Sequence, residues 1–178
     1  MTNRQTLAED ECYNCGCNLR PICADYKGEH KRIVKFVKTK VTAKTPVPAY
    51  DTDAGMDFFY CGDDRIRIDL GDSALIPTGI KMEVPLGYML EMKNKSGIAS
   101  KRSLHVGACV VDRGYSGEIF VNLHNVGLES QYIEPGEKIA QGVFVRIADN
   151  VTLQESDSIY DNQSTARGHG SLGSTGNR

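Results

Sequence analysis

The sequence predicts an all-β protein, because short runs of alternating apolar and polar residues repeat along its middle part. In one such run Ile66, Ile68 and Leu70 alternate with charged residues, and period-two alternation is typical of strands with one face on a core. Many short strands separated by Gly and Pro turn signals favour an antiparallel sandwich or barrel. Further runs alternate at Ile80, Met82 and Val84, at Tyr88, Leu90 and Met92, and at Ile119, Val121 and Leu123.

Composition divides the chain of 178 residues into three parts. Residues 1–30 are polar and contain four of the six cysteines, so we expect an N-terminal extension. Residues 31–163 contain the alternating runs and predict one β core, in which only Gly97–Ser103 suggests a helical turn or two. Residues 164–178 are rich in Gly, Ser and Thr and predict a mobile tail.

Bulk composition argues against several classes of protein. The net charge of -2 gives no broad basic surface for nucleic acid. No apolar run approaches the roughly 18 residues that a membrane span needs, and the first residues do not resemble a signal peptide. We therefore expect a cytoplasmic protein whose cysteines are reduced thiols or metal ligands.

Two segments in the first half of the core could bind an anion or a cation. In AGMDF, a glycine allows a tight turn, and the carboxylate of Asp57 could reach a cation or an arginine. In KNKSGIA, Lys95, Ser96 and Gly97 offer an ammonium, a hydroxyl and free amides at the start of the expected helix, as phosphate sites require. Taken singly, a turn entering a strand and a solvated loop would look the same.

A third segment, VGACVVDRGYSGE, contains two strand-like runs around a turn and predicts a β-hairpin. Asp112 follows Val110 and Val111 at the rim of this hairpin. A carboxylate there is ionised at neutral pH and can accept a proton from water. A turn aspartate that bonds its own backbone is an equally consistent interpretation.

Two further segments follow towards the C-terminus. GEKIAQ places Gln141 at the entry of an apolar strand, where its amide could donate to a phosphate oxygen. RGHGSLGSTG has the composition of a disordered tail, although glycine amides and the guanidinium of Arg167 could also close over an anion. There is no GxxxxGK[ST] motif, which excludes a nucleotide-binding P-loop.

In this order, AGMDF, KSGIA, VGACVVDRGYSGE, GEKIAQ and RGHGSLGSTG resemble the five motifs of the trimeric dUTPase family, from about Lys31 to Arg178. The resemblance implies a distorted jelly roll or β-barrel of short antiparallel strands, assembled as a homotrimer with active sites between subunits. It also implies Mg²⁺-dependent hydrolysis of dUTP to dUMP and pyrophosphate, which lowers dUTP and supplies dUMP for thymidylate synthesis.

The same resemblance implies a role for each matching residue. Asp112 matches the residue that activates the water attacking the α-phosphorus, and Asp57 matches the carboxylate of the Mg²⁺ region, which acts directly or through water. The main chain of Val106–Val111 would pair with uracil, and Tyr115 would pack on the deoxyribose. The implied substrate contacts are Lys95, Ser96, Gly97, Gly107, Val110, Val111, Tyr115, Gln141, Arg167, Leu172, Gly173, Ser174 and Thr175.

Four positions depart from the family pattern. Lys95 stands where arginine is usual, which keeps the charge but loses the bidentate fork. Gly114 occupies a position where aspartate is common, and Ser171 replaces a glycine. Leu172 takes the place of the aromatic residue that stacks over uracil, so stacking energy on the order of 1 kcal/mol is lost.

The N-terminal cysteines are not explained by the resemblance. Cys12, Cys15, Cys17 and Cys23 could bind zinc tetrahedrally, although their spacing is irregular. The alternative is a flexible extension that serves as a docking arm for another protein. The remaining two cysteines, Cys61 and Cys109, lie in or beside strand-like segments, and we expect both to be buried thiols.

Two other functions fit parts of the sequence. dCTP deaminase shares the fold, but that family needs a glutamate in the strand after the hairpin, and this chain has Asn122 there. Asparagine cannot act as a base. The second alternative is a dUTPase-like protein whose main role is to bind a regulator through residues 1–30.

Overall fold

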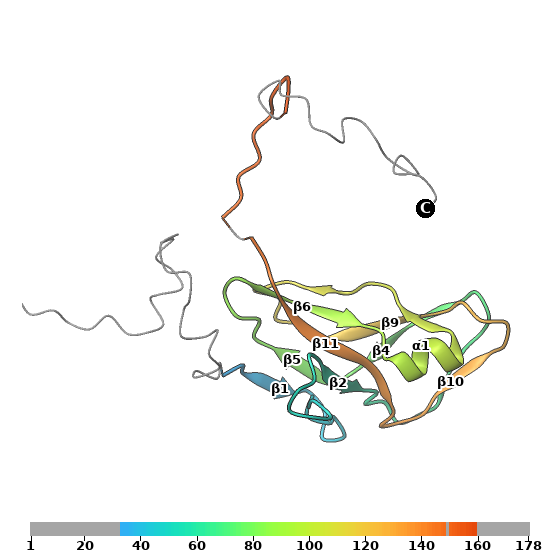
Figure 1. Ribbon diagram of the computed structural model, residues 1–178. Helices are drawn as coiled ribbons and strands as arrows, with labels where there is room; N and C mark the ends of the chain where they lie inside the picture. The colour runs from blue at the N-terminus through green and yellow to red at the C-terminus, as the bar shows by residue number, and fades with distance from the viewer. Residues whose placement is uncertain (1–32, 149, 160–178) are drawn as a thin grey trace, which may run out of the picture.

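The computed structural model describes residues 33–148 and 150–159. Figure 1 shows a β body with one short helix at its edge and an extended segment that leaves the body after the last strand. Several predicted features lie outside the described residues, so they and the predicted boundaries of the three parts stay predictions. These features are Cys12, Cys15, Cys17, Cys23, Arg167, Leu172, Gly173, Ser174 and Thr175.

Strands dominate the described part of the chain, as the alternation predicts. The single helix in that part, α1, spans Ser96–Arg102, within one residue of the predicted helical turns, and no described helix is long or apolar enough to cross a membrane. The strands are β1 (Phe36–Lys38), β2 (Met56–Phe59), β3 (Ile66–Ile68), β4 (Ser73–Pro77), β5 (Ile80–Met82), β6 (Tyr88–Lys93), β7 (Leu104–Val106), β8 (Val110–Val111), β9 (Phe120–Asn125), β10 (Gln131–Ile133) and β11 (Lys138–Arg146).

All strand pairs in the described part are antiparallel. The largest sheet has the order β2-β11-β6-β8, a second has the order β4-β9-β7, and two-stranded ribbons join β1 to β5 and β10 to β3. The all-β jelly-roll prediction is therefore confirmed, but the sheets do not close into one barrel. Strand β11 is the longest and lies between β2 and β6, so it brings distant parts of the sequence into neighbouring rows.

The core confirms the alternation that predicts the strands. In β9 the side chains of Val121 and Leu123 are fully buried, whereas Phe120 and His124 on the opposite face are exposed. One position is wrong: Leu70 is 60% exposed, because β3 ends at Ile68 and the chain turns before Leu70 can reach the core.

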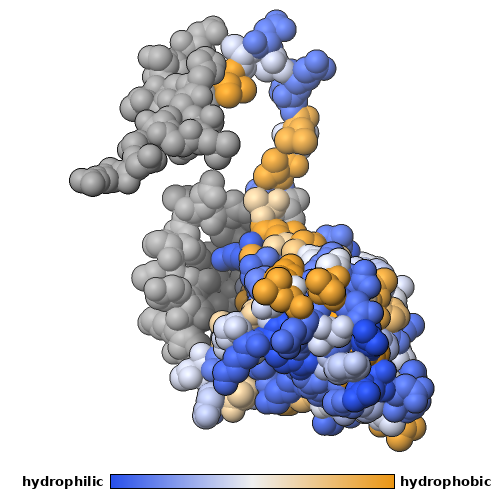
Figure 2. Space-filling view, turned by 90° about the vertical axis from the view of Figure 1, so that its right-hand side faces the viewer, coloured by the Kyte–Doolittle hydropathy of each residue, from blue (hydrophilic) through white to orange (hydrophobic). Residues whose placement is uncertain are grey.

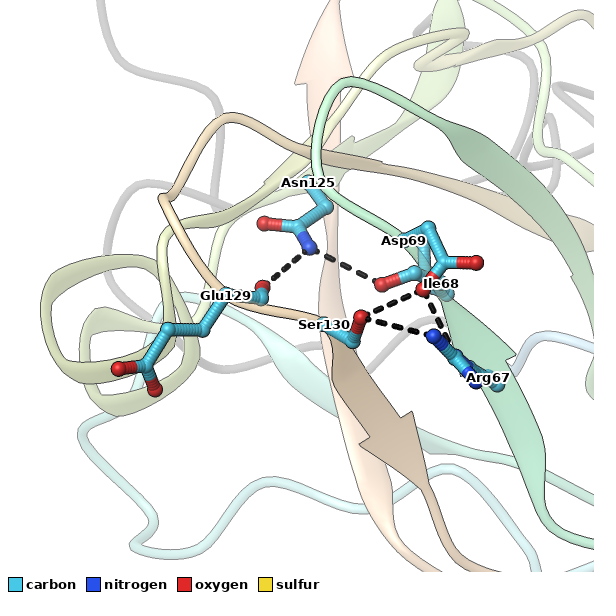
Figure 3. Close-up of polar contacts among 6 residues, drawn as sticks. All are labelled: Arg67, Ile68, Asp69, Asn125, Glu129 and Ser130. Atoms are coloured by element: carbon cyan, nitrogen blue, oxygen red, sulfur yellow. Dashed lines mark hydrogen bonds and ion pairs between the residues drawn. The ribbon is translucent and has the colours of Figure 1, made fainter.

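A polar corner fixes the end of β9 against β3 and β10 (Figure 3). Buried Asn125 donates from Nδ2 to the carbonyl of Ile68 at 3.0 Å and to that of Glu129 at 2.8 Å. Beside it, Ser130 donates to Asp69 Oδ1 at 2.5 Å, and the same oxygen lies 2.7 Å from Arg67 Nε. Since an unpaired buried amide would be costly, these bonds hold the end of β9 in place.

The predicted simple hairpin around Asp112 is wrong. Strand β8, before Asp112, pairs with β6, whereas β9, after it, pairs with β4 and β7, so the two limbs belong to different sheets. The last main-chain hydrogen bond of this segment with β9 runs from the amide of Gly107 to the carbonyl of Asn122. Two residues later the segment lies beside β6, where Met92 N donates to Cys109 O at 2.7 Å. The segment 106–118 is therefore a long excursion between two sheets.

Candidate active site

A buried carboxylate lies between two lysines, and we call these three residues the charged cluster. Asp57 in β2 is 4% exposed. Lys95, just before α1, places its Nζ 2.5 Å from Asp57 Oδ1, and Lys138, the first residue of β11, places its Nζ 2.8 Å from Asp57 Oδ2. Residues separated by 38 and 81 positions in the sequence thus form one contact.

The lysines determine the charge state of Asp57. Burial by itself would raise the pKa of this carboxyl group, but the adjacent ammonium groups of Lys138 and Lys95 outweigh burial and hold the pKa below the ordinary value of 3.8. The carboxylate is therefore ionised at neutral pH. Its Oδ2 atom accepts no hydrogen bond of favourable angle, although Lys138 lies within ion-pair distance.

Gln141 joins the charged cluster from the centre of the sheet. In β11 it is the register partner of both Asp57 in β2 and Lys93 in β6, and its Nε2 donates to the carbonyl of Asn94 at 2.9 Å. A side chain at Gly55 would place its Cβ 2.6 Å from Gln141 Oε1, so a glycine is needed there. The first, second and fourth motifs of the sequence therefore meet in one place.

Helix α1 is held beside this cluster by an arginine that the sequence analysis missed. Arg102 contacts Glu137 Oε1 and the carbonyl of Tyr132, and its Nε donates to Gln131 Oε1 at 3.1 Å. These bonds tie the end of α1 to the turn before Lys138. No local sequence pattern predicts these hydrogen bonds, because the partners of Arg102 lie about 30 residues away in the sequence. Ser96 and Gly97, in the first turn of α1, are exposed.

A small cavity of about 160 Å³ lies along the excursion between the sheets. Its walls include the segment from Ala108 to Val111, with Tyr115 and Phe120 on the other side. Cys109 is therefore half-buried at this cavity, not fully buried as predicted, whereas Cys61 is buried as predicted. A larger groove of about 650 Å³ lies behind Tyr115, away from the other predicted contacts.

Two glycines determine the position of Tyr115. Gly114 has φ 92°, a left-handed conformation that an ordinary side chain adopts at a cost, so glycine is a suitable replacement for the usual aspartate. The Tyr115 hydroxyl donates to the carbonyl of Glu118 at 2.8 Å. A Cβ at Gly117 would lie 2.5 Å from that hydroxyl oxygen, so the ring fits only over a glycine.

Asp112 is exposed, and its side chain has no hydrogen bond or ion pair within residues 33–148 and 150–159. It follows β8, whose last residue pairs with Leu90, whereas Asp57 shares a row of the sheet with Lys93. Standard strand geometry then places Asp112 about 13 Å along the strands and about 14 Å across them from Asp57. The structure therefore does not bring Asp112 to the charged cluster within one chain.

No group of three potential metal-binding side chains occurs in the described ranges. Asp57 is the one predicted metal residue among them, and both of its oxygens already lie near lysines. A closed protein cage for a metal is thus absent from this part of the chain.

The comparisons with known proteins agree on one family. A family model described as dUTPase matches residues 41–176. A deoxyuridine 5'-triphosphate nucleotidohydrolase of Shigella sonnei is 34% identical over 148 residues, which covers 80% of this chain and 95% of that protein. A protein of the same name from Escherichia coli is 33% identical over the same length, with the same coverage.

Solved structures show the same fold. The dUTPase of Staphylococcus bacteriophage 80alpha, determined with dUpNHpp, aligns with a TM-score of 0.73 at 25% identity, covering 82% of this chain and 99% of that one. The dUTPase of phage phi11 of S. aureus aligns with a TM-score of 0.67 at 22% identity, covering 72% of this chain and 99% of that one.

Proposed function

The chain belongs to the dUTPase family and is a dUTP-hydrolysing enzyme, and we propose that Asp112 activates the water while the charged cluster and Gln141 receive the triphosphate. The products are dUMP and pyrophosphate. The observation that best supports the division of roles is the meeting of Lys95, Lys138 and Gln141 around one ionised carboxylate.

The charged cluster suits a triphosphate. The triphosphate has about four negative charges, so its hydrolysis depends mainly on charge neutralisation and positioning. Lys95 and Lys138 offer two ammonium groups, and the amide of Gln141 adds a donor in the same row. Ser96 and Gly97 extend this set at the exposed first turn of α1.

Asp112 suits the role of the base. Its carboxylate is exposed and has no partner in the described part of the chain, so it is free to accept a proton from water. The adjacent small cavity would take the base and the sugar, with Tyr115 on the deoxyribose and the main chain of residues 107–111 on uracil.

The assembly that best supports this division is a homotrimer with active sites between subunits. The separation of Asp112 from Asp57 means that one chain alone does not complete the site. Figure 2 shows an apolar segment leaving the body after β11, in which Val151 and Leu153 are 64% and 93% exposed. Exposed apolar surface of this kind is typical of an interface.

Magnesium fits this site as an ion that binds together with the substrate. Mg²⁺ usually keeps several waters and binds through one or two carboxylates together with substrate phosphates, so a protein cage is not required. Asp57 would hold the ion through water, since its carboxylate is ionised and Oδ2 accepts no well-aligned hydrogen bond. When bound, the ion neutralises part of the triphosphate charge.

Two predicted features lie beyond the described residues. The tail with Arg167, Leu172, Gly173, Ser174 and Thr175 would close over the bound nucleotide, and residues 1–30 would form a separate extension. A solved relative is described as a phage dUTPase that controls transfer of virulence genes. If residues 1–30 bind a regulatory partner, deleting them should leave turnover unchanged but abolish capture of that partner.

The deciding experiment follows pyrophosphate release from dUTP, dCTP, dTTP and UTP with Mg²⁺. We expect release from dUTP alone and its loss in Asp112→Asn. Release of ammonia from dCTP would favour the deaminase alternative despite Asn122. No release from any nucleotide would contradict the proposed function and leave a binding protein as the better description.

A further inference from the structure

Strand β9 presents a polar pair, Asn122 and His124, to the segment that we assign to uracil. The two side chains lie on the same face of β9, and His124 Nε2 is 2.6 Å from Asn122 Oδ1. The amide of Ala108 donates to the same oxygen at 3.4 Å, and the amide of Gly107 donates to the main-chain carbonyl of Asn122 at 2.9 Å. Asn122 therefore accepts from two consecutive amides of the segment.

The pair packs directly against the main chain. A Cβ at Gly107 would lie 2.2 Å from both Asn122 Oδ1 and His124 Nε2, so glycine permits this close approach. On the other side of the same turn, Val106 N donates to Asn94 Oδ1 at 2.7 Å. Three successive peptide groups are thus held by side-chain or main-chain oxygens, and the last of these residues, Ala108, lines the small cavity.

The hydrogen bond between Asn122 and His124 has a defined donor and acceptor. A carboxamide oxygen only accepts hydrogen bonds, so Nε2 of His124 must donate to Asn122 Oδ1. Because this oxygen accepts hydrogen bonds from both His124 and Ala108, the side chain of Asn122 is held in one orientation.

We propose that Asn122 and His124 are positioning residues that fix the peptide groups at Gly107 and Ala108 and thereby set the preference for uracil over cytosine. The inference rests on the proposed function. Uracil and cytosine differ in their hydrogen-bonding edge, where a carbonyl acceptor in one is replaced by an amino donor in the other. A peptide group that can rotate presents either its N–H or its C=O to the base, so it can pair with either base. A peptide group held in one orientation pairs with only one of them.

The test uses the full-length protein and compares KM, kcat and the ratio of kcat/KM for dUTP and dCTP. Asn122→Ala should raise KM for dUTP about threefold to tenfold, the effect of one neutral hydrogen bond, and lower the dUTP to dCTP ratio. The value of kcat should stay within about twofold, because ground-state positioning and not proton transfer is lost. Binding of dUpNHpp should weaken by the same factor as KM rises.

Conservative variants separate positioning from simple loss of stability. Asn122→Asp keeps the accepting oxygen and should restore KM, and His124→Gln keeps a donor and should stay close to wild type. His124→Leu should resemble Asn122→Ala with a smaller effect. His105→Ala is the matched control, because His105 is exposed opposite His124 and its side chain has no hydrogen bond within the described residues.

The outcomes are distinct. If the wild type releases pyrophosphate from dUTP but Asn122→Ala keeps its KM and its selectivity, the inference is wrong and the proposed function stands. An equal effect in Asn122→Ala and Asn122→Asp would also overturn it, as would a fall in melting temperature with unchanged KM. A wild type that does not cleave dUTP would instead refute the proposed function.

Discussion

The two ends of the proposed active site are built in different ways. In the charged cluster, Asp57 of β2 is buried, Lys95 before α1 is half-buried and Lys138 of β11 is exposed, and each charge already has a partner. The other end, from Gly107 to Tyr115, consists mainly of main chain, turns and a small cavity, and its aspartate is exposed and unpartnered in the described chain. The proposed phosphate end is thus preorganised within one chain, whereas the base and water end would depend on backbone shape and, in the proposed trimer, on a neighbouring copy.

The largest effect is expected from Asp112→Asn. We expect kcat to fall about 10²–10⁴-fold, the usual contribution of a general base, while KM and the melting temperature stay unchanged because the side chain has no structural partner. Steady-state kinetics and thermal unfolding measure the two effects. A large loss of stability would show that Asp112 is structurally engaged after all.

At the phosphate end, Lys95→Ala should affect both activity and stability. Loss of one charge-assisted hydrogen bond should lower kcat/KM on the order of 10–100-fold. Lys93→Ala is the control, because Lys93 lies two residues away and pairs with Glu91 near the surface, where ion pairs contribute about 0–1 kcal/mol. Equal losses in the two variants would mean that general positive charge, not the position of Lys95, matters.

The pH dependence of stability should identify Asp57. Because its folded-state pKa is lowered, the carboxylate stabilises the fold above the ordinary pKa of 3.8, and this contribution is lost as pH falls further through the folded-state value. Asp57→Asn should cost about 2 kcal/mol at pH 7, less than a fully buried pair because both lysines are partly exposed. The difference from wild type in urea unfolding should shrink below about pH 4.

At the base end, Gly117→Ala should displace Tyr115, because the added Cβ meets the ring. We expect discrimination between dUTP and UTP to fall about tenfold, the typical value of one misplaced group in a pocket. Competition between the two nucleotides measures this. Ser116→Ala, one residue away and exposed, should leave the discrimination intact, and a loss there would argue for general flexibility of the turn.

The smallest effect should come from Arg102→Leu, which releases α1 from Glu137 and Gln131. We expect kcat/KM to fall about threefold to tenfold, because the three hydrogen bonds of Arg102 that position the helix are lost while the helix itself remains. Hydrogen exchange of the α1 amides should rise in parallel. Lys101→Leu, on the exposed side of the same turn, should change neither quantity.

Much of the fold could be predicted because alternation is a local property. The pattern of Val121 and Leu123 indicates a strand without knowledge of its partners, and the start of α1 is predicted to within one residue. Pairing is not local, and the hairpin at Asp112 was wrong because β8 contacts β6 instead of its neighbour in sequence. The prediction that Leu70 is buried was wrong for a different reason: the alternating pattern continues to Leu70, but the chain turns before that residue reaches the core.

The site could be predicted motif by motif but not as an arrangement. Asp57, Lys95 and Gln141 were each identified, yet nothing in the sequence indicated that Lys138 completes the cluster or that Arg102 anchors the helix. These contacts link positions more than 30 residues apart. The polar pair on β9 was seen only as Asn122, and its effect on Gly107 depends on a distance that no pattern encodes.

The ion pairs around Asp57 have a consequence for each catalytic cycle. Since Lys95 and Lys138 already pair with Asp57, triphosphate binding at the proposed site would exchange one counter-charge for another and would not be the capture of an anion by unpaired cations. Part of the attraction is thereby offset, which limits how tightly pyrophosphate can be retained. When pyrophosphate departs, Asp57 would again be available as the counter-charge of both lysines.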